Sequence, residues 1–394
     1  MKKFMVVGFT AFLSLLLIAC SSKPKLYILN WGEYINYDLV SEFEDTYGVT
    51  VKWSYADSNE LMEQRVVSQT TAYDIVIPSD YMIEKLYTNG YLQKIDLTKL
   101  TNYSQDAFMD GVNVIMAEMF KDNEDVTSAY EVSIPYFWGV FGIMYNRSLD
   151  GLETYIETKK WQVMFEEDPA DTFSRPLLVG MYDVPRFAYS LSMIYANEVE
   201  LIDDLDALNV ASAANLTLSE TILSQRQYEE WSTDFLKKNI EAGLLDYAFV
   251  YVGDFFDTYL IKSAEATTAQ EARDLTSHIG IFVPENTIAF YDGMVIPTNA
   301  RNVDLAYQFI DFFLDPINAY ENSSIVGYTT ALTATYEMIQ NATYGDEIRA
   351  AMVSDYPYNP AISENFAGKP LIAFSNEFTD EIASMVYRVL AAGN

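Results

Sequence analysis

The residues best suited to bind a ligand are aromatic and acidic side chains that follow short apolar runs. Trp31 and Tyr34 come directly after an alternating apolar run, Ser79 and Tyr81 come after a β-branched run, and Asp292 follows a third. Aromatic faces attract cations, and a carboxylate at the end of an apolar run is costly unless it has a partner. This combination of residue types predicts a site for a positively charged ligand.

The same aromatic residues also have structural interpretations. Trp31 could be a buried plug at the end of a strand. Tyr34, Tyr81, Tyr251 and Tyr328 could each be an ordinary cleft or surface tyrosine in a chain that holds 30 tyrosines. The sequence alone leaves these alternatives open.

Most catalytic and metal-binding arrangements lack the residues they need. His278 is the one histidine and Cys20 the one cysteine, so two-histidine metal sites and thiolate metal sites are excluded. We expect His278 to be a core histidine, because it lies in an apolar strand. No phosphate-binding glycine motif follows a strand, and although 57 acidic residues leave a two-carboxylate glycosidase open, no pair stands out. We therefore expect a binding protein that uses no metal and no cofactor and is not an enzyme.

The N-terminus has the pattern of an export signal. Lys2 and Lys3 precede an apolar stretch, and residues 17–20 read Leu-Ile-Ala-Cys. This tetrapeptide is similar to a bacterial lipobox, which implies a signal peptide over residues 1–19, a lipidated Cys20 and a tether over residues 20–25. An ordinary signal peptide with an incidental cysteine is the alternative. No later run is apolar enough to cross a bilayer, so we expect an extracytoplasmic protein held at the membrane by its N-terminal lipid.

Length and charge set further bounds. A chain of 394 residues exceeds what one hydrophobic core usually holds, which favours two domains. Its formal charge of −33 repels nucleic acid and attracts cations, although solubility alone would also explain that charge. We expect no nucleic-acid partner.

The N-terminal third alternates between strand and helix patterns. Strands are predicted from residue 26, over 49–54 and over 73–77, with helices from Asn36 to Gly48 and over 58–69 between them and a further helix over 82–90. This order implies a parallel sheet with right-handed crossovers. The carboxyl ends of such strands share one edge, so Trp31 and Ser79 should lie beside the same crevice.

Two long apolar segments predict connections to a second domain. Residues 133–146 are a candidate for a strand that leaves one domain and enters the other, and residues 278–284 followed by 288–297 are the candidate for a second crossing. Between them we expect helices over 183–199 and 215–238, the latter broken near Ser219, and a strand over 249–254. Helices over 306–314 and 376–390 should follow. Two α/β domains joined by crossing strands can close over a ligand at a hinge.

Five motifs in order resemble the spermidine/putrescine-binding proteins of ABC transporters. They are Asn30-Trp31-Gly32-Glu33-Tyr34, residues 73–81, residues 92–96, residues 134–139 and residues 292–297. The resemblance implies an α/β, two-lobed type II periplasmic-binding-protein fold, with parallel or mixed sheets flanked by helices. The implied lobes are residues 26–138 with 291–325 and residues 139–290 with 326–394. It also implies a monomeric solute-binding protein that delivers a polyamine to an ABC permease.

The resemblance assigns site residues by position. The ligand-binding residues that it implies are Trp31, Tyr34, Ser79, Tyr81, Asp183, Tyr251, Phe290, Asp292 and Tyr328, with Asp292 as the ammonium partner. Together they would form an aromatic slot closed by a carboxylate.

The segment Asp183-Val184-Pro185-Arg186-Phe187 departs from the family pattern. Family members have an Asp-Asp-x-Arg-Glu-like segment here, and aligning Arg186 leaves Asp183 on the first acid but puts Val184 and Phe187 on the others. A one-residue shift also loses at least one acid. The ligand could therefore be a shorter diamine, a monocation or a molecule whose own carboxylate faces Arg186, unless Arg186 caps a helix or forms a surface salt bridge. Binding of a different solute, an acidic surface lipoprotein and an extracellular hydrolase remain the alternative functions.

Overall fold

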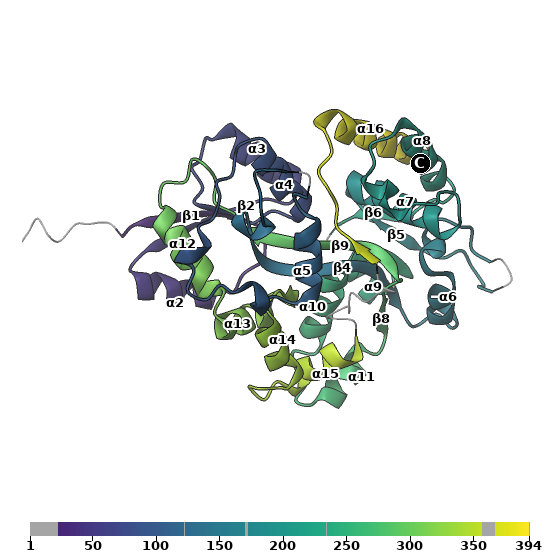
Figure 1. Cartoon of the computed structure of the whole chain (residues 1–394). Coiled ribbons are helices and arrows are strands. Elements are labelled where there is room, and N and C mark those ends of the chain that lie inside the picture. Colours follow the sequence, from purple (N-terminus) through teal and green to yellow (C-terminus); the bar gives the residue numbers. More distant parts are fainter. Residues whose placement is uncertain (1–22, 122, 170–171, 234, 357–366, 394) are drawn as a thin grey trace, which may run out of the picture.

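The computed structural model describes residues 23–121, 123–169, 172–233, 235–356 and 367–393 (Figure 1). The predicted signal peptide over residues 1–19 and the predicted lipidation site Cys20 lie outside these ranges, as do residues 20–22 of the predicted tether over residues 20–25. The first strand already begins at Lys25, the last residue of that tether.

Three parallel strands form the first sheet. They are β1 (Lys25–Asn30), β2 (Thr50–Tyr55) and β3 (Ile75–Val76), in the order β2-β1-β3. The helices that follow them are α2 (Tyr37–Tyr47), α3 (Asn59–Ser68) and α4 (Asp80–Thr88). The predicted alternation of strand and helix is confirmed, and so is the parallel sheet.

Local capping explains where the first helices begin and end. The Asn36 side chain accepts a hydrogen bond from the Asp38 backbone N–H, and Ser58 does the same for Leu61. Gly48 ends α2 with a φ of +65°, a left-handed conformation that glycine adopts without steric cost. These polar residues therefore fix both the start of each helix and its distance from the preceding strand.

The second sheet is built on two long neighbouring strands, β4 (Ile134–Asn146) and β9 (Asn286–Met294). Every residue of β4 is buried, which explains its continuous apolar sequence. Its first half pairs antiparallel with β9, and its second half pairs with β7 (Tyr247–Tyr251) and β8 (Ile279–Phe282). One strand thus belongs to two sets of neighbours, as the crossing-strand hypothesis requires.

The remaining strands complete a mixed sheet with the order β11-β9-β4-β7-β5-β6, with β10 and β8 paired to β4. These strands are β5 (Val179–Tyr182), β6 (Glu230–Ser232), β10 (Thr329–Thr330) and β11 (Ala367–Lys369). The remaining α-helices are α5 (Asp110–Glu118), α6 (Leu152–Lys159), α7 (Pro185–Glu198), α8 (Ala213–Leu223), α9 (Phe235–Glu241), α10 (Val252–Lys262), α11 (Ala269–Thr276), α12 (Val303–Phe313), α13 (Pro316–Val326), α14 (Thr333–Gln340), α15 (Glu347–Asp355) and α16 (Asn376–Gly393). Helices flank both sheets, which confirms the predicted α/β fold class.

The prediction of one broken helix over residues 215–238 is wrong. The chain forms α8, then the short strand β6, then α9. Glu230 to Ser232 pair in parallel with Gly180 to Tyr182 of β5 at the edge of the sheet. Pairing with a distant strand overrides the local helical pattern. Sequence periodicity reports only on local structure, so it does not reveal such pairing.

His278 is not the core histidine that we expected. It lies in the turn before β8, and its side chain is 32% exposed. Its Nε2 atom is 3.7 Å from a carboxylate oxygen of Glu241. The apolar strand begins one residue later, at Ile279, so the histidine stays at the edge of the sheet.

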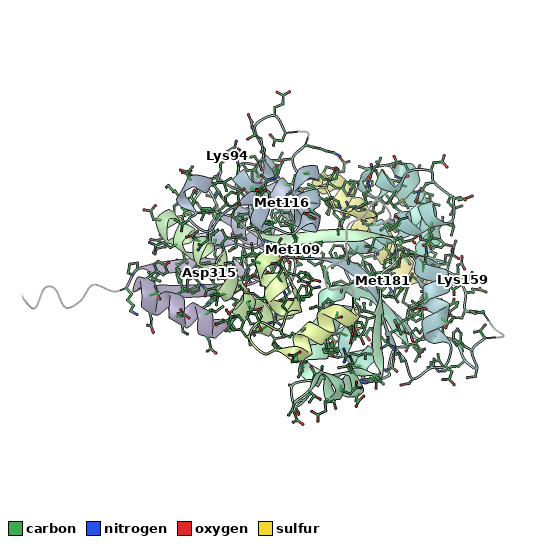
Figure 2. The ribbon with its side chains drawn as sticks, turned by 60° about the horizontal axis from the view of Figure 1, so that its bottom comes forward. Lys94, Met109, Met116, Lys159, Met181 and Asp315 are labelled. Carbon is green, nitrogen blue, oxygen red and sulfur yellow. The ribbon has the colours of Figure 1, made fainter. Side chains whose placement is uncertain are left out.

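The elements divide to either side of the long strands. In Figure 1, β1, α2 and α12 lie on one side, whereas α6, α8 and α16 lie on the other. Figure 2 places Asp315 and Lys94 on the first side and Met181 and Lys159 on the second. The predicted lobes, residues 26–138 with 291–325 and residues 139–290 with 326–394, stay a prediction. None of the helices in the described ranges is long and apolar enough to cross a bilayer.

Candidate functional site

Asp292 lies at the centre of the candidate site and is only 5% exposed. The Tyr34 hydroxyl donates to its Oδ2 atom at 2.7 Å, and the Ser79 hydroxyl donates to its Oδ1 atom at 2.7 Å. Burial raises the pKa of Asp292 from 3.8 to about 6, although both hydroxyl hydrogen bonds act in the opposite direction. Asp292 forms no ion pair with any lysine, arginine or histidine in the described part of the chain. The carboxylate is therefore held in place without a cation from the described residues.

The backbone brings Ser79 to Asp292. Beyond β3 the chain continues beside the end of β9, where Ser79 and Asp292 form an isolated antiparallel bridge. Asn59, buried at the start of α3, donates from its amide to the Ser79 hydroxyl at 3.1 Å and accepts from the Ser79 backbone N–H at 3.0 Å. Because Asn59 fixes both groups, the serine hydroxyl stays directed at the carboxylate.

Tyr34 is positioned by aromatic packing. Its ring meets those of Phe137 and Tyr328 edge-on, at centroid distances of 5.1 and 5.3 Å. Edge-to-face pairs of this kind are favourable beyond the area that they bury. Tyr34 is thus a buried residue and not a surface tyrosine. It contributes its hydroxyl group to the site.

An aromatic wall continues from Asp292 along the second sheet. Phe290 lies two residues before Asp292 on β9, so both side chains face the same way. Its ring packs edge-on against Tyr251 at 4.8 Å. Gly139 lies opposite Phe290, and a Cβ atom there would come within 3.2 Å of the ring. The glycine therefore leaves room for the aromatic side chain.

A cavity of about 660 Å³ joins these residues, and all the predicted site residues except Asp183 line it. Trp31 is half-buried at its edge, so it is no buried plug. Tyr81 is buried and donates from its hydroxyl to Glu60 at 3.2 Å. Acidic residues of the lining outnumber lysines by seven to three, which favours a cationic ligand.

The structure does not bring Asp183 to the cavity. Its side chain is exposed, and its backbone N–H donates to the Ser232 carbonyl. Val184 and Phe187 line the wall instead. The start of α7 turns the apolar residues inwards and the acid outwards, so this part of the wall is apolar.

Arg186 has a structural role. Its guanidinium group is buried, donates to the Leu208 carbonyl at 2.8 Å and to the Asn209 side chain at 2.9 Å, and stacks on Phe374 at 3.9 Å. Burial lowers its pKa to about 10. Arg186 does not line the cavity, so a ligand carboxylate that faces it finds no support. Arg186 also does not form a surface salt bridge, because its partners are carbonyl and amide groups.

Sequence reasoning missed several residues of the site. Asn59 positions Ser79, while Lys237, Asp254 and Asp257 line the cavity on α9 and α10. Asp254 could have been found, because it is the last residue of a predicted strand. Lys237 could not, since its segment was predicted as part of one long helix. No group of three His, Cys, Asp or Glu side chains in the described residues is arranged to hold a metal ion.

Comparisons with known proteins agree with this geometry. The family described as bacterial extracellular solute-binding proteins matches residues 38–350. A spermidine/putrescine-binding periplasmic protein of Salmonella typhimurium is 26% identical over 329 residues, which is 83% of each chain. A putrescine/cadaverine-binding protein of Pseudomonas aeruginosa is 26% identical over 324 residues, 81% of this chain and 83% of the relative. The resemblance inferred from the five motifs is confirmed.

Solved structures share the fold. A putative spermidine/putrescine ABC transporter protein from Listeria monocytogenes superposes with a TM-score of 0.70 at 24% identity, covering 94% of this chain and all of that one. A GABA receptor, Atu4243, superposes with a TM-score of 0.58 at 15% identity, covering 94% of this chain and 98% of that one. The cavity, the two-sheet architecture and the family match over most of the sequence lead to one conclusion: the chain belongs to the bacterial extracellular solute-binding proteins.

Proposed function

We propose that this protein captures a polyamine of the spermidine/putrescine class outside the cytoplasm and delivers it to an ABC permease, without catalysis. The observation that carries the proposal is Asp292, a buried carboxylate with two hydroxyl donors and no ion pair within the described chain. An ammonium group of the ligand would supply the missing cation. Phe290, Tyr251 and Tyr34 would pack against its carbon chain and attract its charge.

The relatives support the choice of ligand class. Their names refer to spermidine, putrescine and cadaverine, all of which are cationic amines on flexible carbon chains. The aromatic lining and the excess of acids suit such molecules. A different small solute in the same fold is the second candidate, which the exposed Asp183 and the apolar Val184 and Phe187 favour.

The proposal extends to the location of the protein. A signal peptide over residues 1–19 would direct export, and a lipid on Cys20 would anchor the monomeric protein to the cell membrane. Closure of the two lobes around the ligand would create the form that docks on the permease. The matched family is extracellular, which agrees with this location.

Calorimetric titration of the purified protein with putrescine, spermidine and spermine tests the proposal. We expect one of them to bind and Asp292→Asn to abolish the binding. Asp304→Asn on the exposed surface of α12 is the control and should bind like the unaltered protein. A folded protein that takes up none of the three amines would refute the polyamine assignment and favour another solute or an acidic surface lipoprotein. Turnover of a glycoside panel would point to a hydrolase instead.

A further inference from the structure

A second acidic group in the cavity already holds a protein ammonium. Asp254 and Asp257 lie in the first turns of α10, and Lys237 of α9 reaches both. Its Nζ atom is 2.6 Å from a carboxylate oxygen of Asp257 and 3.5 Å from one of Asp254. All three side chains line the same cavity as Asp292, and the lysine side chain is only 18% exposed.

Two tyrosine rings connect this group to Asp292. Tyr34 donates to Asp292 and packs edge-on against Tyr328, whose hydroxyl donates to Asp254 at 3.3 Å. Tyr328 also lies directly on the first turn of α10, because a Cβ atom at Gly253 would come within 2.6 Å of its ring. The cavity thus has two acidic ends on either side of an aromatic slot. One end has a resident ammonium and the other has none among the described residues.

We propose that Lys237 determines specificity by occupying the second ammonium position, so that the protein recognises one ammonium group of its ligand strongly and a second one weakly. This inference rests on the proposed function. A ligand ammonium that approached Asp254 and Asp257 would have to displace Lys237 from a short charge-assisted hydrogen bond. If it did not displace the lysine, it would meet like charge.

Glu33, Asp57 and Glu60 also line the cavity, but the wall at the start of α7 offers no acid. Val184 and Phe187 line it with apolar groups, which suit a carbon chain and leave a second ammonium unpaired there. The other lysines of the lining have partners of their own, since Lys262 is paired with Glu241 and Lys238 lies over the ring of Phe235. Lys237 is therefore the lysine whose removal should change the discrimination between one and two ammonium groups.

Two amines with the same carbon chain isolate this effect. The dissociation constants of 1,4-diaminobutane and 1-aminobutane are measured by calorimetry on the full-length protein, on Lys237→Gln and on the double variant Lys237→Gln/Asp257→Asn. The unaltered protein should bind the two amines within about tenfold of each other. Lys237→Gln should raise the preference for the diamine by a further tenfold or more, which is about the strength of one charge-assisted hydrogen bond. The double variant should lose most of that gain.

Lys85→Gln is the matched control. Lys85 is also largely buried and forms a 2.8 Å ion pair, with Glu63, but it does not line the cavity. It should leave the ratio of the two constants unchanged. Melting curves of all variants show that each is folded before the constants are compared.

The outcomes separate this inference from the proposed function. A diamine preference of a hundredfold or more in the unaltered protein, or a ratio that Lys237→Gln leaves unchanged, overturns the role of Lys237 but keeps the amine site. A folded protein that binds neither amine, spermidine nor spermine overturns the proposed function and the inference together.

Discussion

At the scale of single residues, the site depends on a carboxylate that is costly to bury. Asp292 is 5% exposed, and the hydrogen bonds to its carboxylate in the described structure come from hydroxyl groups alone. Two hydrogen bonds reduce the cost of its charge but do not remove it, which is why its pKa stays raised at about 6. The unliganded protein is thus less stable than it could be, and a cationic ligand would recover part of that stability.

Asp292→Asn should stabilise the unliganded protein at neutral pH. The folded-state pKa of about 6 exceeds the ordinary value of 3.8, so ionised Asp292 costs on the order of 3 kcal/mol above pH 6. This cost is absent below pH 3.8 and grows as the pH rises towards 6. Urea unfolding should therefore show the variant more stable by about 3 kcal/mol at about pH 7.5, and by about 1 kcal/mol at about pH 4.5. A variant less stable than the parent at both pH values would contradict this cause of the pKa shift.

Amine affinity should fall on acidification. Only the ionised form of Asp292 attracts an ammonium group, while the ligand itself stays protonated. With a pKa of about 6, affinity should be about tenfold weaker at about pH 5 than at about pH 7. Calorimetry in two buffers with different ionisation enthalpies should detect release of nearly one proton on binding at the lower pH. An affinity that does not change over this range would exclude Asp292 as the ammonium partner.

At the scale of elements, the site depends on where strands and helices end. Ser79 and Tyr34 follow strands of the first sheet, whereas Phe290 and Asp292 lie on β9. The end of β3 and the end of β9 are tied by backbone hydrogen bonds between Val76 and Val295 in both directions. Tyr251 lies at the end of β7, another strand of the second sheet. Each of these elements contributes one or two side chains, so the site exists only when the sheets lie together.

Arg186 anchors the segment before α16 to α7, and its loss should destabilise the protein. Its guanidinium group donates to Leu208, Asn209 and, at 3.4 Å, to the Ile372 carbonyl. Arg186→Met would remove the donor to the buried Leu208 carbonyl and to the partly buried acceptors of Asn209 and Ile372, at a cost of about 2–4 kcal/mol in urea unfolding.

Arg388→Met on α16 is the matched control for this prediction. Arg388 pairs with Glu220 through two hydrogen bonds, but the pair is exposed to solvent. Exposed ion pairs contribute little to stability, so this variant should unfold at nearly the same urea concentration as the parent. Equal losses in the free energy of unfolding for the two substitutions would show that the contribution of Arg186 to stability does not depend on its burial.

At the scale of the whole molecule, β4 and β9 join the two sides into one unit. The first half of β4 pairs with β9 and its second half with β7 and β8, so the second sheet cannot form without this strand. The first sheet is tied to β9 through the bridges of Val76 with Val295 and of Ser79 with Asp292. The cavity lies where residues from both sides meet. Ligand binding should therefore act on the stability of the entire chain.

Scanning calorimetry should show a single unfolding transition that ligand shifts as a whole. At a ligand concentration about 100 times the dissociation constant, binding adds about 2.7 kcal/mol to the free energy of unfolding. The transition of Asp292→Asn should not move with ligand. Two separate transitions, of which ligand shifts only one, would show that the two sides unfold independently.

The sequence by itself determined the α/β fold class, the two long strands β4 and β9 and the family, and it predicted most of the residues that line the cavity. Local patterns suffice for these features, since strand ends, caps such as Asn36 and Gly48, and motifs around Trp31 and Asp292 are contiguous in the chain. Tertiary structure alone decided that Asp183 turns outwards, that Arg186 binds carbonyl groups and that β6 interrupts a helical pattern. It also decided that Lys237 lies between Asp254 and Asp257, because α9 and α10 come together only in the folded protein. Side-chain direction and pairing between distant segments depend on packing, which no local pattern encodes.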